Sequence, residues 1–174
     1  MFNFHIEETE IQGVLKIELD VFEEYRGNIW TSYNSVELQK LSDRFNQTFH
    51  HDKFSVSNFN VFRGFHGDNK STKLVTCVYG EIDQYVLDWR KGSETFGHVL
   101  KFNISRTRPI SIMIPAGCGN AYHVLSNQAV YHYKLSYSGN YIDSDDQFTV
   151  PWNASEIKGV FSKDFSPLTS ERDK

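Results

Sequence analysis

The sequence is poor in the residues that mark several classes of protein. Its 174 residues include only two cysteines, Cys77 and Cys118, and they show no C-x-x-C spacing. Two isolated thiols do not make the disulfide framework of a secreted mini-protein, so we expect both to be buried and reduced. There are four prolines, and no Gly/Ser-rich or charge-block segment precedes the tail. Nothing therefore indicates a linker, and the length suits one domain over residues 1–174.

Long apolar runs and an excess of positive charge are also missing. No run approaches the about 18 residues of a membrane helix, and the N-terminal residues lack a basic region followed by an apolar stretch. We therefore expect no membrane span, no signal peptide and a soluble, cytoplasmic protein. The formal net charge of -4 argues against a general nucleic-acid surface. An anionic ligand must then be bound by a few local arginines and lysines.

Aromatic residues are abundant, at 15% of the chain, which suits a core rich in β-sheet. Short apolar or alternating runs separated by turn signals predict strands at 59–65, 74–79, 82–89, 98–104, 110–114, 122–125 and 130–137. One helix is predicted to begin after the cap Asn34, with Glu37 three residues on, and to end at or just after Asn46. Its apolar face would be Leu38, Leu41 and Phe45. Many short strands with little helix favour an antiparallel sandwich or barrel.

The alternation of side chains along a strand decides which residues can share a cavity. Tyr133 and His132 must point to opposite faces. Arg63 and His66 are three positions apart, so both can line one pocket only if the strand bends or bulges near Gly64. The same alternation places Gln84 on one face with Ile82, Val86 and Asp88, and Tyr133 on one face with Tyr131, Leu135 and Tyr137.

Six short motifs occur in a fixed order along the chain. They are Asn60-Val-Phe-Arg-Gly-Phe-His66, Lys73-Leu-Val-Thr-Cys-Val-Tyr-Gly-Glu81, Asp88-Trp-Arg90, Thr95-Phe-Gly97, Ile114-Pro-Ala-Gly117 and Tyr133-Lys134. The set resembles the sugar-nucleotide epimerase family typified by dTDP-4-dehydrorhamnose 3,5-epimerase, whose pattern reads N-V-x-R-G-x-H, K-L-V-x-C-x-x-G-E, D-x-R, T-F-G, I-P-x-G and Y-K. The similarity runs from about Val21 to Asp164. It implies a mainly β, cupin-type jelly roll.

The resemblance also implies a reaction: a carbon beside the ketone of a nucleotide-linked 4-keto sugar is deprotonated and reprotonated, without a cofactor. A histidine suits the base at neutral pH, and a protonated tyrosine suits the donor. The family's base falls on His66 and its acid on Tyr133. The carboxylate that orients the histidine falls on Asp164 in Ser162-Lys-Asp164, where the family reads S-x-K-D. Lys73 would stabilise the negative charge on the ketone oxygen.

Further residues are candidates for substrate binding. The diphosphate should meet Arg63 and Arg26, because guanidinium groups bind phosphate oxygens bidentately. In the family, the segment of Arg26 reaches across a dimer interface, so the resemblance implies a homodimer in which Arg26 serves the neighbouring site. Tyr137 is a candidate for stacking on the base, although a core role is equally open, and His51 is a further candidate contact.

Two departures from the family pattern bear on the substrate. Asn120 replaces the histidine of I-P-x-G-x-x-H, and Gln84 replaces the acidic residue of G-E-x-x-D that partners it. Two amides hydrogen-bond but do not exchange protons near neutral pH. We therefore expect a different 4-keto sugar, as in the related branch that modifies GDP-4-keto-heptoses for bacterial capsules. The alternative is dTDP-4-keto-6-deoxyglucose, and inversion at carbon 3 alone or at carbons 3 and 5 stays open.

Two other functions of a jelly-roll protein fit the sequence less well. A metal-dependent cupin would need converging ligands, but the seven histidines contain no H-x-H, so no metal is expected. A non-catalytic carbohydrate- or nucleotide-binding jelly roll is disfavoured because His66, Tyr133 and Lys73 are all present.

Overall fold

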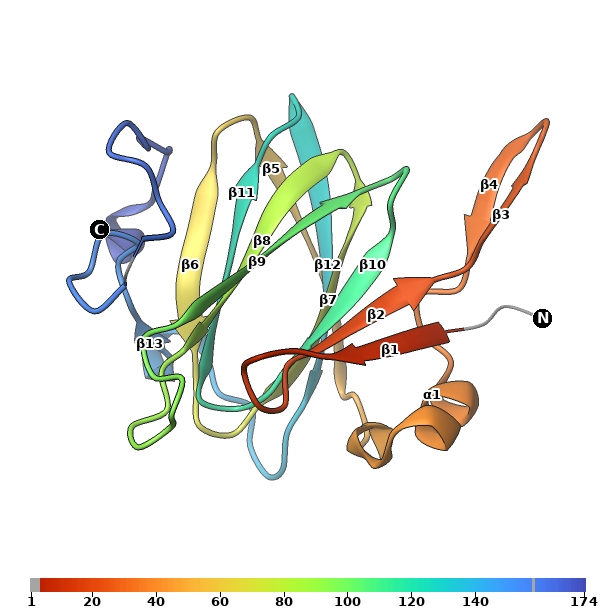
Figure 1. The fold of residues 1–174 in the computed structure, drawn as a ribbon, viewed down its shortest axis with the longest axis horizontal. Coiled ribbons are helices and arrows are strands. Elements are labelled where there is room, and N and C mark those ends of the chain that lie inside the picture. The colour runs from red at the N-terminus through yellow and green to blue at the C-terminus, as the bar shows by residue number, and fades with distance from the viewer. Residues whose placement is uncertain (1–3, 158) are drawn as a thin grey trace.

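The computed structural model describes residues 4–157 and 159–174. Two antiparallel sheets face each other and enclose the centre of the molecule (Figure 1). The larger sheet has the order β1 (Phe4–Glu8), β2 (Leu15–Leu19), β10 (Ile110–Ile114), β7 (Thr72–Tyr79), β12 (Gln128–Ser136) and β5 (His51–Asn58). The smaller has the order β13 (Phe148–Thr149), β6 (Phe62–Gly67), β11 (Cys118–Val124), β8 (Glu81–Asp88) and β9 (Val99–Ser105). The predicted antiparallel jelly roll is confirmed.

A two-stranded hairpin, β3 (Val21–Glu24) and β4 (Gly27–Trp30), projects away from the two sheets (Figure 1). The sequence-based prediction missed this hairpin and also β1, β2, β5 and β13. Strand β5 shows the reason: its apolar residues Phe54 and Val56 are 63% and 56% exposed, while polar side chains point inward. The apolar face of this edge strand is directed away from the core, so its alternation does not reveal which residues are buried.

Three hydrophobic clusters hold the layers together. The first lies between the sheets and contains inward residues of both, such as Ile82, Val86 and Ile112. The second lies on the outer face of the larger sheet, under Leu38 and Phe45. The third lies on the outer face of the smaller sheet and is composed of Phe62, Phe65, Tyr85, Leu87, Ala121 and Val150, packed against the C-terminal residues Trp152, Phe161 and Phe165. Burial of apolar surface at these layers is the main source of stability.

The helix is shorter than predicted. It spans Ser35–Leu41 (α1), and the backbone N–H of Glu37 donates to the Oδ1 atom of Asn34 over 3.2 Å, which confirms the predicted cap. Ser42 is extended and caps a separate 3₁₀ turn, η1 (Asp43–Phe45), through its side chain. The prediction of one helix to Asn46 was wrong because Ser42 leaves the helical conformation and starts a new turn. Among the described residues, no helix has the length and apolarity to cross a bilayer.

Strand β6 bends at Gly64, as the spacing of Arg63 and His66 required. Gly64 has φ +124°, and the register between β6 and β11 shifts where Asn120 pairs with His66. A Cβ atom on Gly64 would lie 2.4 Å from the carbonyl oxygen of Asn120. Only glycine fits this conformation and this approach.

The D-x-R and T-F-G motifs form a hydrogen-bonded loop after β8. The buried carboxylate of Asp88 accepts hydrogen bonds from the Arg90 guanidinium at 2.8 Å and from the Ser93 and Thr95 hydroxyls at 2.6 Å each. Burial opposes ionisation of Asp88, but these donors outweigh it and hold the pKa of Asp88 far below its usual value. The motif thus fixes the loop after β8 rather than supplying a group to a reaction.

Candidate active site

A cavity of about 300 Å³ lies between the two sheets, and it is lined by half of the residues predicted to act on a substrate, including His66, Lys73 and Tyr133. Its wall is built by inward side chains of β5, β6, β7, β11 and β12 and by the segment that follows β12. The lining residues include Lys53, Ser55, Arg63, His66, Lys73, Asn120, Tyr131, Tyr133, Tyr141, Asp143 and Arg172. This volume is at the small end of known ligand sites and suits a sugar ring.

His66 is held by a carboxylate, but not by the one predicted. The His66 Nε2 atom lies 2.5 Å from Asp173 Oδ1, and Ser170 donates to Asp173 Oδ2 over 2.9 Å. Asp164 is exposed on the C-terminal segment, so its assignment as the partner of His66 was wrong. Asp173 is buried in the 3₁₀ turn η3 (Glu171–Asp173) near the end of the chain, and η3 packs on β6.

A sequence signal for Asp173 was present. Ser170-Glu-Arg-Asp173 has the full S-x-basic-D spacing, whereas Ser162-Lys-Asp164 lacks one position. Burial opposes ionisation of Asp173, but the hydrogen bond and charge of His66 and the Ser170 hydroxyl outweigh it, so the pKa of Asp173 is lowered. The carboxylate therefore stays ionised at neutral pH and orients the imidazole, whose proton position it fixes.

Lys73 lines the cavity from the beginning of β7 and is almost completely buried, at 5% exposure. Its ammonium donates to the backbone carbonyl of His66 over 3.2 Å. Burial lowers the pKa of Lys73, and the charge of Asp68 opposes that effect. A desolvated cation beside the histidine is well suited to stabilise negative charge that develops on a bound ligand.

Tyr133 lines the cavity from β12, and His132 lies on the opposite face, as the alternation predicted. Burial raises the pKa of Tyr133, while the positive charges of Lys53 and Arg63 act in the opposite direction. The phenol is therefore protonated at neutral pH and can donate a proton. Lys53 is the cross-strand neighbour of Tyr133, and its ammonium donates to the Tyr141 hydroxyl over 2.7 Å.

The two amides that depart from the family pattern are in direct contact. Gln84 Nε2 donates to Asn120 Oδ1 over 2.7 Å, and the Tyr131 hydroxyl lies 2.8 Å from Gln84 Oε1 and 3.0 Å from Asn120 Oδ1. Gln84 is fully buried behind the wall, whereas Asn120 and Tyr131 line the cavity. The simultaneous replacement of two residues thus maintains a hydrogen-bonded pair without a titratable group.

The positive charge of the cavity comes from residues far apart in the chain. Arg63 lines it and donates from Nε to the Ser57 hydroxyl over 3.0 Å, and Arg172 enters it from η3. Arg26 does not reach this cavity: it lies at the exposed turn of the β3–β4 hairpin and forms an ion pair with Glu24. Lys53 and Arg172 were missed by the sequence analysis, because neither belongs to a motif that was identified there.

Two of the predicted contacts, Tyr137 and His51, lie beside the cavity rather than in its wall. Their ring centroids are 5.5 Å apart, and each packs against Tyr141, at 5.7 Å and 4.6 Å respectively. Tyr141 itself lines the cavity. The aromatic surface available to a planar base is therefore provided first by Tyr141, with Tyr137 and His51 supporting it.

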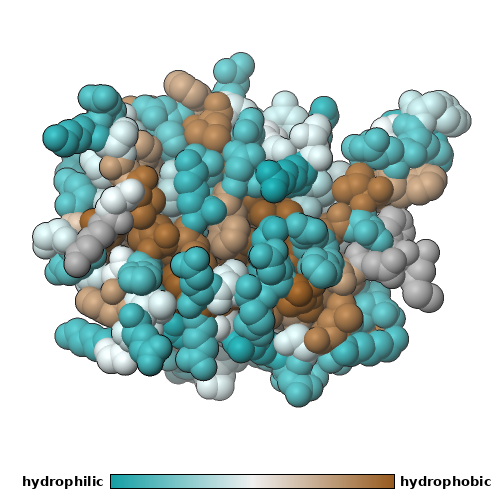
Figure 2. All heavy atoms as spheres, viewed as in Figure 1, coloured by the Kyte–Doolittle hydropathy of each residue, from teal (hydrophilic) through white to brown (hydrophobic). Residues whose placement is uncertain are grey.

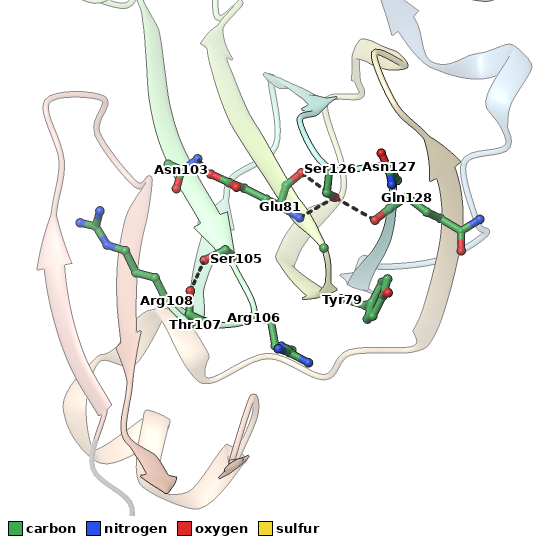
Figure 3. A pocket seen from close by; sticks show the side chains of 11 residues that line it. Tyr79, Glu81, Asn103, Ser105, Arg106, Thr107, Arg108, Ser126, Asn127 and Gln128 are labelled. Atoms are coloured by element: carbon green, nitrogen blue, oxygen red, sulfur yellow. Dashed lines mark hydrogen bonds between the residues drawn. The ribbon is translucent and has the colours of Figure 1, made fainter. Parts of the chain in front are cut away.

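A second, larger cavity of about 690 Å³ lies at the other end of β7, beside the β7–β8 turn (Figure 3). It is lined by Tyr79, Glu81, Asn103, Arg106, Arg108 and Gln128, among others. The side chains of Arg106 and Arg108 point in different directions, and the hydroxyls of Ser105 and Ser126 are occupied by local hydrogen bonds. None of the residues predicted to act on a substrate lies there.

Among the described residues, no group of three His, Cys, Asp or Glu side chains is arranged to hold a metal ion. Cys77 and Cys118 are free and buried, as predicted. Burial raises the pKa of the two thiols to about 11 and about 12 respectively. Both thiols therefore stay protonated at neutral pH.

Comparison with known proteins agrees with this geometry. The profile of the family described as dTDP-4-dehydrorhamnose 3,5-epimerase matches residues 8–174. The dTDP-4-dehydrorhamnose 3,5-epimerase of Salmonella typhimurium is 34% identical over 165 residues, which cover 90% of each chain. The crystal structure of the Bacillus anthracis dTDP-4-dehydrorhamnose 3,5-epimerase with TDP and PPi bound superposes with a TM-score of 0.86 at 26% identity, covering 98% of this chain and 96% of that one. The corresponding protein of Elizabethkingia anophelis gives 0.82 at 28% identity, covering 98% and 93%.

Proposed function

Because this chain belongs to the dTDP-4-dehydrorhamnose 3,5-epimerase family, we propose that it inverts carbons 3 and 5 of dTDP-4-keto-6-deoxyglucose. The chain is an epimerase of sugar nucleotides and hence an isomerase. The observation that carries the proposal is that His66, Lys73 and Tyr133 line one cavity, with Asp173 bound to His66.

Each residue then has a step to perform. His66, oriented by Asp173, removes the proton from the carbon beside the ketone. Lys73 stabilises the negative charge that appears on the ketone oxygen as the enolate forms. Tyr133 returns a proton to the carbon from the opposite side, since its phenol is protonated at neutral pH.

Arg63 and Arg172 offer guanidinium groups to the diphosphate. Of these two residues, Arg63 was predicted from the sequence to bind the diphosphate.

The proposed nucleotide is dTDP, whereas the sequence alone favoured GDP. The GDP-4-keto-heptose suggested by the amide pair has no counterpart among the relatives compared above, all of which are named for a dTDP sugar. We therefore take the dTDP-linked sugar as the first substrate. A cytoplasmic location and a role in bacterial capsule synthesis remain predictions.

Hydrogen exchange tests the reaction directly. The protein is incubated with dTDP-4-keto-6-deoxyglucose in deuterated water, and NMR follows deuterium at carbons 3 and 5; the GDP-4-keto-heptose serves as the second substrate. Deuterium at both carbons of the dTDP sugar is the expected result. Exchange at carbon 3 alone would reduce the proposal to a 3-epimerase. No exchange with either sugar would refute the enzymatic function, and His66→Asn gives the background rate.

We further propose a homodimer that uses the β3–β4 hairpin and the outer face of the larger sheet. Phe22 and Ile29 of the hairpin are 54% and 58% exposed, and Phe54 and Val56 form a second exposed apolar surface on the edge strand β5. Hydrophobic residues gather at the surface where the hairpin leaves the body (Figure 2). Apolar surface of this kind is usual where another protein binds. A second copy would cover it and place Arg26 near a neighbouring cavity.

Complementation between inactive variants tests the dimer. If Arg26 serves the neighbouring subunit, Arg26→Ala and His66→Asn are each impaired, and mixed dimers regain one intact site. Unfolding and refolding the two variants together should then restore part of the activity. No recovery, or a monomeric mass by light scattering, would contradict the shared site.

A further inference from the structure

The orientation of the Asn120 amide is determined by a chain of hydrogen bonds that starts at the backbone. Gln84 Nε2 donates to the carbonyl oxygen of Tyr85 over 2.9 Å, and a backbone carbonyl can only accept. This contact fixes which end of the Gln84 amide is nitrogen. Its oxygen then faces the Tyr131 hydroxyl at 2.8 Å.

The same chain fixes Asn120. Because Gln84 Nε2 also donates to Asn120 over 2.7 Å, the Asn120 atom at that contact must be its oxygen. The Tyr131 hydroxyl lies 3.0 Å from the same Asn120 oxygen, and its one proton is shared between that oxygen and Gln84 Oε1. Burial raises the pKa of Tyr131 well above its usual value, so the hydroxyl retains this proton throughout the physiological range.

The NH₂ group of Asn120 is consequently the end of the amide that remains available to a ligand. Within the described part of the chain, no protein atom accepts a hydrogen bond from it, and Asn120 lines the cavity. Asn120 is also the cross-strand partner of His66, whose backbone carbonyl binds Lys73. Asn120 and Lys73 therefore both adjoin His66 in the wall of the same cavity.

We propose that the Asn120 NH₂ group is a second donor, beside Lys73, to the ketone oxygen as it becomes an enolate, and that Gln84 and Tyr131 are positioning residues that prevent the amide from turning over. The inference rests on the proposed function. Asn120 is neutral, so it adds a hydrogen bond without adding a proton-transfer group beside the base.

The buried packing around the amides supports a fixed donor. Gln84 is fully buried and Tyr131 is 1% exposed, and the Tyr131 ring stacks on Tyr122 with centroids 4.2 Å apart. A donor that is already oriented requires little reorganisation when charge develops, which is the condition under which such groups accelerate a reaction.

Steady-state kinetics with dTDP-4-keto-6-deoxyglucose tests the donor. Asn120→Leu should lower kcat by about 10²- to 10³-fold with little change in KM, because the contact strengthens in the transition state. Gln84→Met should lower kcat less, on the order of tenfold, since it only releases the amide. The double variant should lose no more than Asn120→Leu alone, because Gln84 acts through Asn120.

Three results would overturn the inference: an unchanged kcat in Asn120→Leu, a change confined to KM, or additive losses in the double variant. Gln128→Met, on an exposed residue beside the cavity of Figure 3, is the matched control and should keep the wild-type kcat. Binding of dTDP by calorimetry verifies that each variant is folded. A wild-type protein inactive on every 4-keto sugar would instead refute the proposed function itself.

Discussion

The Nε2 atom of His66 lies 2.5 Å from the Oδ1 atom of Asp173, although 107 positions separate them in the chain. The contact forms because the C-terminal segment returns along β6, where Phe62 N donates to Leu168 O over 2.9 Å and η3 packs on the strand. The site is thus formed jointly by the C-terminal segment and the strands of the two sheets.

Replacing Asp173 by Asn should therefore disable the reaction. Asparagine lacks the negative charge that stabilises the imidazolium formed when His66 takes a proton. We expect kcat for epimerisation to fall by about 10²-fold or more. Asp164→Asn is the matched control, since Asp164 is exposed and was assigned this role only from the sequence. Equal losses in the two variants, or none in Asp173→Asn, would contradict the structural assignment.

Asp88 should dominate the loss of stability in acid. Its pKa is lowered in the folded state, so it stabilises the fold above the unfolded-state pKa of about 3.9, and the contribution disappears as pH falls through the lower folded value. Urea unfolding at decreasing pH should show a steep fall in the free energy of unfolding below about pH 4.

The variant Asp88→Asn checks that assignment. It leaves Arg90 without its carboxylate and should lower the free energy of unfolding at pH 7 by about 3 kcal/mol or more. Its acid dependence should be shallower than that of the wild type, because the titrating group is gone. A parallel acid dependence in the two proteins would mean that other carboxylates, such as Asp173, control acid unfolding.

Much of the fold was predictable from the sequence because the inner strands carry clear hydrophobic signals. Strand β10 was predicted with its observed bounds, Ile110–Ile114, and all five of its residues are buried. The N-terminal strands were missed because their apolar faces meet α1 and η1 rather than the space between the sheets, and β5 has an exposed apolar face. Alternation alone does not tell which layer a strand faces.

Site residues that belong to a sequence motif were predictable, whereas residues that reach the cavity only through the folding of distant segments were not. His66, Lys73 and Tyr133 lie together as expected. Lys53 was overlooked because its strand was not recognised. Asp173 was overlooked because a nearby, shorter match to the same pattern ends at Asp164. The complete spacing of Ser170-Glu-Arg-Asp173 favours the second carboxylate, and the three-dimensional path of the C-terminal segment identifies it as the partner of His66.

Gly64 should tolerate no side chain. An alanine Cβ there would lie 2.4 Å from the Asn120 carbonyl oxygen and 2.5 Å from the Ala121 side chain, in a backbone with φ +124°. We expect Gly64→Ala to lower the midpoint of thermal unfolding markedly and to impair activity, since β11 and Asn120 must shift. Gly92→Ala is the control: Gly92 has φ +89° with open space around it, so only the conformational cost of about 1–2 kcal/mol applies. Similar midpoints for both variants would show that β6 and β11 can move apart to accommodate the added Cβ atom.

Lys53 should set the upper pH limit of the reaction through Tyr133. Its ammonium stabilises the deprotonated phenol and so lowers the pKa of Tyr133, against the larger effect of burial, which raises it. Because Tyr133 must be protonated to act as the acid, activity is lost as pH rises through that pKa. Lys53→Met removes the charge, raises the pKa and should move the alkaline limb of kcat to higher pH. Lys40→Met, on the exposed face of α1, should leave the limb in place. A limb that moves to lower pH, or not at all, would show that a different group controls it.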